Sequence, residues 1–308
     1  MSGAIEMSTS PVGRLGLPAG AGPLTILRAS LSGGLLRIGP AWAVLAGALS
    51  SRTPLDNGAA LLRLAGAMVL ADVGWGIVWR LTAADSAEEA QGDAGFASFA
   101  PYAQPGALLA RIRTRLQHMA AIHGASAASS WHELLAGLAL IVVLGLLLGL
   151  PAFLLSCAAI LVVFWSWSIA RRGFRPALCH SLVVTALPWL LGVTLAEVNI
   201  TAWDSAAWFA PGVLMVAFAT LQWRVHRAYL GLGTRGFWLG QAAVLAALIW
   251  LRQPVAAAVA ACLLAPPFWW LARVGPTVQD VSLFLARSAS WWWATMILAA
   301  IAARTRLA

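Results

Sequence analysis

The chain has 308 residues, of which 61% are hydrophobic and only 10% are charged, and its mean hydropathy is +0.81. A soluble domain carries about 25% charged residues, so this composition excludes an ordinary soluble enzyme or a nucleic-acid-binding module and indicates an integral membrane protein. All twenty basic residues are arginine, and the formal net charge is +9. The predicted fold class is therefore all-α, a polytopic membrane protein.

The amino-terminal residues 1–23 are rich in Gly, Ser and Pro and lack the basic-then-apolar layout of a signal peptide. We expect them to form a flexible cytoplasmic tail, followed by a single transmembrane domain over residues 24–308. The three cysteines fall in apolar runs at no ligand-like spacing, so neither a disulfide framework nor a zinc site is indicated.

Charged residues mark the ends of the predicted spans, because a hydrocarbon core of roughly 30 Å takes about 20 apolar residues per helix. One charge-free run between Glu133 and Arg171 is too long for one helix, and Pro151 is expected to divide it into spans three and four. With this pair, nine spans are predicted, and the other seven cover residues 29–51, 58–80, 176–197, 205–228, 236–251, 254–272 and 281–303.

The distribution of arginine predicts the orientation, since short loops with excess Arg stay in the cytoplasm. The tail and the segments after spans two, four, six and eight carry fourteen Arg, the opposite face carries five, and Arg287 is intramembrane. The amino terminus is thus expected in the cytoplasm and the carboxyl terminus on the opposite face, most simply of a bacterial inner membrane. The long cytoplasmic loop 81–131 contains a predicted interfacial helix, residues 106–123, whose arginines bind either lipid headgroups or substrate.

Acidic residues are concentrated in the segment from Asp72 to Asp93. Asp72 lies inside span two, and an intramembrane carboxylate marks a function or a charged partner, for which Arg37 and Arg287 are candidates. Asp85, Glu89 and Asp93 follow at steps of four, which would place them on one helical face as a metal site. The other interpretation of these three residues is a solvated acidic loop.

Histidine and tryptophan supply the remaining candidate ligands. His180 and His226 lie nearest to membrane depth, and either could ligate the magnesium of a chlorophyll-type pigment or act as a packing residue. Several of the seventeen tryptophans lie at span ends, as expected of interfacial belts. Four others lie where a flat ligand could stack, although packing is the simpler role: Trp75, Trp79, Trp189 and Trp223.

The nine spans, the polar segments after spans two and six, and the aromatic and basic end of span four together resemble the UbiA superfamily of intramembrane prenyltransferases over nearly the whole chain. Two segments are similar to its chlorophyll and bacteriochlorophyll synthase branch: PAWAVLAGALSS at 40–51 and WSIARRGFRPALCHSLVVTALPWLLGVTLA at 167–196. The carboxyl-terminal RSASWWWATMILAAIAAR is weaker support. The resemblance implies a helical bundle around a lipid-facing cavity for an isoprenoid chain, with Mg²⁺ holding a diphosphate at two Asp-rich motifs.

The sequence departs from these motifs. A first motif that begins at Asp72 would place Gly76 and Arg80 at its aspartate positions, so only the displaced Asp85, Glu89 and Asp93 keep the spacing. No Asp or Glu occurs between Asp204 and Asp280, where the second motif should lie. The family's Tyr-x-x-x-Lys motif is replaced by Trp167-Ser-Ile-Ala-Arg171. Four arginines could grip a diphosphate directly by forked hydrogen bonds, or serve as ordinary positive-inside residues: Arg171, Arg172, Arg224 and Arg227.

Two functions remain open. The residues favour a degenerate, noncatalytic relative that keeps the cavity and binds (bacterio)chlorophyll, quinone or an isoprenoid lipid, as a subunit or assembly factor of a photosynthetic membrane complex. Its predicted ligand-binding residues are Asp72, Trp167, His180, Trp223 and His226. The alternative is an active prenyltransferase that uses Mg²⁺ to move a polyprenyl group from its diphosphate to a tetrapyrrole or aromatic acceptor.

Overall fold

The computed structural model describes residues 39–51, 57–76, 78–79, 129–170, 177–195, 205–229, 236–271, 273 and 278–307. Within these residues every regular element is a helix. The predicted tail, the predicted interfacial helix 106–123 and the acidic ladder from Asp85 to Asp93 lie outside the described residues.

The helices follow the predicted spans closely. Their bounds are α2 Gly39–Ser50, α3 Gly58–Val69, η2 Leu70–Gly74, α6 Ser129–Leu148, α7 Leu150–Ala170, α8 Ala177–Ser181, η4 Leu182–Ala186, α9 Leu187–Thr194, α10 Ser205–Tyr229, α11 Phe237–Trp250, α12 Pro254–Leu271 and α13 Val278–Leu307. The π-helical turn η2 continues α3, and α8, η4 and α9 form one helix. Apart from the start of the first span, which precedes the described residues, the ends agree with the prediction to within about one helical turn.

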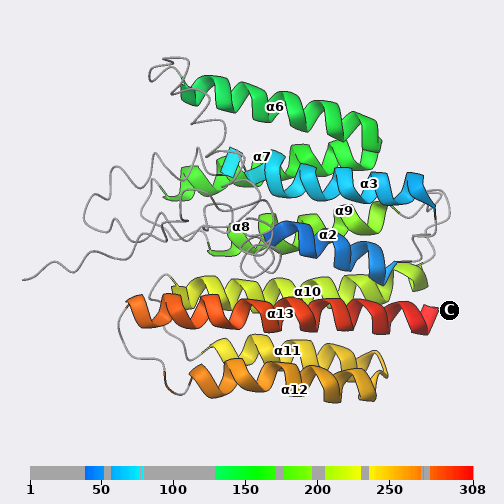
Figure 1. Ribbon diagram of the computed structural model, residues 1–308, viewed down its shortest axis with the longest axis vertical. Coiled ribbons are helices and arrows are strands. Elements are labelled where there is room, and N and C mark those ends of the chain that lie inside the picture. The colour runs from blue at the N-terminus through cyan, green and yellow to red at the C-terminus, as the bar shows by residue number, and fades with distance from the viewer. Residues whose placement is uncertain are drawn as a thin grey trace, which may run out of the picture.

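The helices lie side by side and run in alternating directions (Figure 1). Consequently α7, α10 and α12 finish at one end of the bundle, where α8, α11 and α13 begin. We call this the His226 end, because His226 lies in the last turn of α10. The opposite end holds the start of α10 and the carboxyl terminus of the chain.

Proline and glycine explain two irregular points in these helices. Pro188 follows η4 closely, and since proline has no N–H and crowds the carbonyl four residues before it, the helix widens into a π turn there. Gly149, with φ +105°, separates α6 from α7. The predicted break at Pro151 is therefore shifted, because a left-handed glycine ends α6, while Pro151 fits the first turn of α7.

The interior contains two hydrophobic clusters. One is built mainly by α10, α11, α12 and α13, and the other mainly by α3, η2, α6, α7 and η4, while α2 and α9 contribute to both. The link between α2 and α9 is a close backbone approach. A Cβ on Gly47 would collide with the carbonyl oxygen of Trp189, and a Cβ on Gly192 would collide with that of Val44. Only glycine at these two positions allows the two helices to approach this closely.

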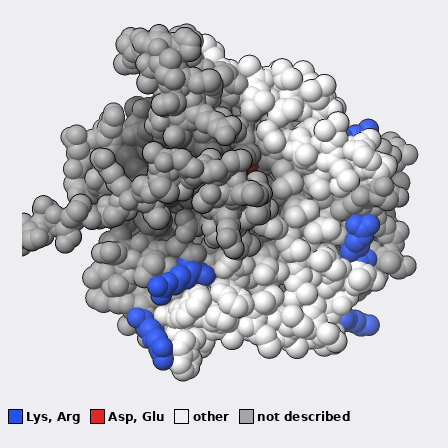
Figure 2. All heavy atoms as spheres, viewed as in Figure 1, with Lys and Arg blue, Asp and Glu red and all other residues white. Residues whose placement is uncertain are grey.

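The outer surface is strongly apolar. Leu62, Leu147 and Val255 are each at least 75% exposed, and the other exposed large hydrophobic residues are spread over nearly all the helices. On the face shown in Figure 2, the described arginines lie towards the two ends of the bundle, and the described surface between them carries no basic side chain. One described helix, Ala177–Thr194, is long and apolar enough to cross a membrane. It is mostly buried, as the core helix of a soluble protein can also be, so the polytopic arrangement remains a prediction.

Candidate functional site

Three side chains from distant parts of the chain meet at the His226 end. Trp79 follows η2 on its helix, His180 lies in the last turn of α8, and His226 lies in the last turn of α10. The rings of His180 and His226 stack with centroids 3.8 Å apart and planes inclined by 14°. The ring of Trp79 meets that of His180 edge-on, with centroids 5.5 Å apart and planes at 83°. The structure thus joins two of the predicted ligand-binding residues in one aromatic group.

The stacking geometry decides what this histidine pair can bind. The lone pair of an imidazole nitrogen lies in the plane of its ring, so two nearly parallel rings direct their lone pairs within two separate, nearly parallel planes. They cannot converge on one metal ion in this arrangement. A single nitrogen remains suitable as an axial ligand or a hydrogen-bonding partner. Among the described residues, no group of three or more His, Cys, Asp or Glu is placed to hold a metal.

The ring nitrogen Nδ1 of His180 is buried and has no hydrogen-bond partner, and the residue is only 3% exposed. Whether this nitrogen donates or accepts, leaving it unpaired in the interior costs about 1–3 kcal/mol. Buried polar atoms in proteins nearly always have a partner, so such an atom indicates a group that completes it. Nδ1 of His180 is therefore the atom of this site that most clearly indicates a missing ligand.

Two arginines, Arg224 and Arg227, lie within two residues of His226 on α10. The guanidinium carbons of Arg224 and Arg227 lie 4.6 Å and 5.5 Å from the ring centroid of Trp223. The Nε atom of Arg224 is buried without a hydrogen-bond partner. A Cβ on Gly236, the residue before α11, would lie 2.7 Å from Nη1 of Arg224, so the guanidinium packs against the start of that helix. Arg224 and Arg227 together form a cationic edge that could hold an anionic group.

Asp72 lies elsewhere, in the π turn η2. It is 3% exposed, and its Oδ2 has no hydrogen-bond partner. The predicted pairing with Arg287 is wrong, because the side chain of Arg287 is exposed on α13. Arg37, the other predicted partner, lies outside the described residues.

Two of the four tryptophans that were candidates for ligand stacking belong to the core. The indole N–H of Trp75 donates to Ser156 Oγ at 3.2 Å, and the ring of Trp189 stacks on Phe218 with centroids 5.8 Å apart. Both indoles are fully buried in the core, where Nε1 of Trp189 has no hydrogen-bond partner. Trp79 and Trp223, in contrast, lie in or beside the histidine group.

Several predicted site residues cannot be placed. Asp85, Glu89, Asp93, Arg171 and Arg172 lie outside the described residues, as does the side chain of Trp167, whose backbone belongs to α7.

Sequence reasoning missed four further residues with unpartnered polar atoms, namely Trp42, Gln241, Ser288 and Trp292. The rule that singled out Asp72, a polar side chain inside an apolar span, would have found Gln241 and Ser288.

Comparison of the chain with protein-family models, with curated proteins and with solved structures found no match in any of the three. The resemblance to the UbiA superfamily accordingly rests on the sequence segments quoted above.

Proposed function

We propose that this chain is a polytopic membrane protein that binds a flat ring ligand with an isoprenoid tail, a (bacterio)chlorophyll or a quinone, at the His226 end of the bundle. In this proposal it is a noncatalytic relative of the UbiA prenyltransferases. The observation that carries the proposal is the buried, unpartnered Nδ1 of His180 within an aromatic group. Such a nitrogen fits the magnesium of a chlorophyll-type ring or the hydroxyl or carbonyl of a quinone.

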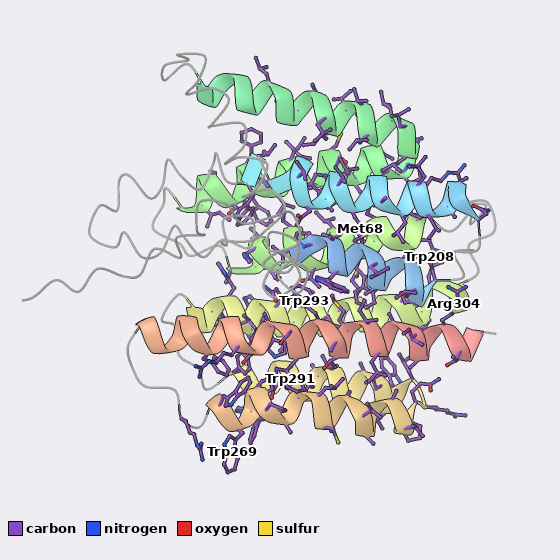
Figure 3. The ribbon with its side chains drawn as sticks, viewed as in Figure 1. Met68, Trp208, Trp269, Trp291, Trp293 and Arg304 are labelled. Atoms are coloured by element: carbon purple, nitrogen blue, oxygen red, sulfur yellow. The ribbon has the colours of Figure 1, made fainter. Side chains whose placement is uncertain are left out.

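The membrane part of the proposal is supported by the outer surface. Exposed large apolar side chains occur along α6, α7, α11 and α12, an arrangement that is costly in water and favourable in lipid. Aromatic residues mark both ends: Trp269, with Arg273 4.6 Å from its ring centroid, lies at the His226 end, while Phe209 and Trp250 meet 5.3 Å apart at the opposite end. Figure 3 shows Trp269 at one end and Trp208 and Arg304 towards the other. This matches the interfacial belts of membrane proteins.

The positive charge of Arg224 and Arg227 favours a ligand that carries an acidic substituent. Arg224 and Arg227 are three residues apart on α10 and share the side of the helix that carries Trp223, and the Nε of Arg224 lacks a partner. His226 lies two residues after Arg224, on a different side of α10, so the acidic substituent would have to extend around the helix. A carboxylate or diphosphate would supply charge-assisted hydrogen bonds there. In the proposed complex, His180 holds the ring, and Arg224 and Arg227 hold its acidic group. Bound membrane lipid and the other subunits of a photosynthetic membrane complex are its expected partners.

The noncatalytic part rests on the missing carboxylates. A prenyltransferase of this type needs Mg²⁺ at two acidic motifs to neutralise the departing diphosphate. The chain has no Asp or Glu between Asp204 and Asp280, so α10 and α11 supply basic and aromatic groups instead. The competing function is a transferase that relies on Asp85, Glu89 and Asp93 for one Mg²⁺.

One preparation tests both functions. The protein is expressed in a phototrophic bacterium, purified in mild detergent, and assayed for bound pigment by absorption and for bound quinone by extraction. We expect a bound ring ligand in the wild type and its loss in His180→Phe, which keeps an aromatic ring but removes the nitrogen. Trp269→Phe, at an exposed position on α12, is the matched control and should keep the ligand. Absence of pigment and quinone, or their retention in His180→Phe, would overturn the proposed site.

The transferase alternative is tested on the same protein with geranylgeranyl diphosphate, Mg²⁺ and chlorophyllide or an aromatic acceptor. A prenylated product that depends on Mg²⁺ and disappears in Asp93→Ala would refute the noncatalytic assignment. Under our proposal no product forms at any Mg²⁺ concentration.

A further inference from the structure

Three of the unpartnered hydrogen-bonding atoms among the described residues lie on α11 and α13. They are Nε2 of Gln241, Oγ of Ser288 and the indole Nε1 of Trp292. The three residues are 5%, 0% and 7% exposed, so none of these atoms is satisfied by bulk solvent. Each can donate a hydrogen bond. The group is separate from the histidine site, and nothing in the proposed function uses it.

Helix geometry and ring contacts bring these three residues towards one region. Gln241 lies four residues after Phe237 on α11, while Phe284, Ser288 and Trp292 are spaced four apart on α13, so each set lies along one helical face. The ring of Phe237 contacts those of Phe284 and Trp292, in both cases with centroids 5.3 Å apart. The two faces therefore meet through these rings, with the donors alongside.

The side of α13 that carries Trp292 is an interior one. Figure 3 shows Trp291 towards α11 and α12 and Trp293 towards α2, as expected of residues two positions apart on a helix. Trp292, between them, is buried in the same hydrophobic cluster as Phe237 and Phe284. Aromatic and aliphatic side chains of this cluster therefore surround Trp292.

The chemistry of the donors restricts what can complete them. A hydroxyl, an amide and an indole N–H are neutral, so an anion buried against them would lose its hydration without gaining an opposite charge. A neutral acceptor oxygen loses far less on leaving water and gains hydrogen bonds from these donors. An apolar molecule that carries a carbonyl group has this combination of properties.

We infer that the core of the α10–α13 group is a second binding site, which takes the carbonyl oxygen of a neutral, apolar ligand. Gln241, Ser288 and Trp292 supply donors to the carbonyl groups of the ligand, no more than two of them to one oxygen, and the rings of Phe237 and Phe284 contact the apolar part. Carbonyl oxygens of this kind occur on quinone rings and on the ester groups of diacyl lipids. Both sources share the recognition chemistry, and the test separates them.

The experiment follows the thermal unfolding midpoint of the full-length protein purified in detergent and freed of lipid. In one arm a tailless benzoquinone is added, with p-xylene, which has methyl groups in place of the carbonyl oxygens, as the control. In the other arm the protein is transferred to vesicles of ester-linked or ether-linked phosphatidylcholine. We expect stabilisation by the quinone but not by p-xylene, or by the ester-linked but not by the ether-linked lipid. The arm in which the unfolding midpoint rises shows whether the carbonyl oxygen comes from a quinone or from a lipid ester.

Variants then connect the response to the three donors. Gln241→Leu, Ser288→Ala and Trp292→Phe should each weaken the apparent affinity about two- to tenfold, the usual value of one neutral hydrogen bond. Trp75→Phe is the matched control for the indole, because the N–H of Trp75 already has Ser156 as its partner. It should leave the affinity unchanged.

The ligand-free midpoint distinguishes a ligand site from a buried structural water. If the donors are unsatisfied without ligand, Ser288→Ala leaves the ligand-free midpoint unchanged or raises it. Ser50→Ala, which removes a buried hydroxyl that donates to Gly47 O at 2.9 Å, should lower it. The inference is overturned if neither arm responds to the carbonyl group, or if Ser288→Ala lowers the ligand-free midpoint as Ser50→Ala does.

Discussion

The imidazole of His180 on α8 stacks on that of His226 on α10, with ring centroids 3.8 Å apart. Trp79, from a third helix, meets His180 at its edge. This contact holds the His226 end of α8 against α10, and it leaves Nδ1 of His180 without a partner. One residue therefore combines a packing role with a free binding group, and the two roles can be separated by mutation.

Replacement of His180 by alanine should destabilise the protein by about 2–4 kcal/mol, because it removes a fully packed ring from between two aromatic neighbours. His180→Phe keeps a ring of similar size and should cost less than about 1.5 kcal/mol. Chemical denaturation of ligand-free protein in detergent measures both. Equal losses for Ala and Phe would show that the nitrogen, rather than the ring, stabilises the folded state.

The contact between α2 and α9 should be intolerant of a single methyl group. Gly47→Ala and Gly192→Ala each place a Cβ against a backbone carbonyl of the opposite helix, so we expect losses of about 1–3 kcal/mol or more. Gly212→Ala is the matched control, since nothing lies within 4 Å of its added Cβ, and alanine should stabilise this helical position by about 0.5–1 kcal/mol. In a denaturation series, the unfolding free energy should fall for Gly47→Ala and Gly192→Ala and rise for Gly212→Ala. Similar effects at all three glycines would contradict the close approach.

The turn between α11 and α12 should be improved by glycine. Arg252 has φ 55°, a left-handed conformation that costs an ordinary residue roughly 1–2 kcal/mol relative to glycine. Arg252→Gly should therefore raise the unfolding free energy by about 1 kcal/mol, whereas Arg252→Ala, which keeps the Cβ, should not. A thermal shift assay compares the two variants. A gain with alanine as large as that with glycine would attribute the effect to loss of charge.

Asp72→Asn should raise the stability of the ligand-free protein. The carboxyl group is buried with Oδ2 unpartnered, and a neutral amide of the same shape costs less to hold there than an ionisable carboxyl. We expect a gain of roughly 1–3 kcal/mol, measured by denaturation at neutral pH. A loss of stability would show that the carboxylate has a charged partner, for which Arg37 is the remaining candidate.

The His226 end of the bundle and the opposite end, which holds the carboxyl terminus, should lie on opposite sides of the membrane. The arginine bias predicts that the segment between α10 and α11 faces the cytoplasm and that the carboxyl terminus, at the other end of the bundle, faces away from it. Reporter fusions at residue 232 and after residue 308 test this arrangement. A cytoplasmic signal from both fusions would refute the alternating topology.

The positions of the helices could be predicted because charge and proline interrupt apolar runs independently of the tertiary fold. The start of α10 follows from Asp204, and the bounds of α11 and α12 follow from Arg235, Arg252 and Arg273 by this rule. The break after α6 was predicted at Pro151 and occurs at Gly149, because proline is compatible with the first turn of a helix and a left-handed conformation is not compatible with continuing one.

The site could be predicted only as a set of residue types. The sequence by itself determined that His180, His226 and Asp72 are rare polar residues in apolar spans, since the cost of burying a polar group holds in any fold. Only the tertiary structure decided that His180 and His226 stack, and that Nε2 of Gln241, Oγ of Ser288 and Nε1 of Trp292 lack partners. These facts depend on how the helices are rotated and how closely they approach, which glycine contacts such as that of Gly47 with Trp189 determine. Packing between distant segments has no signal in the period or composition of a single helix.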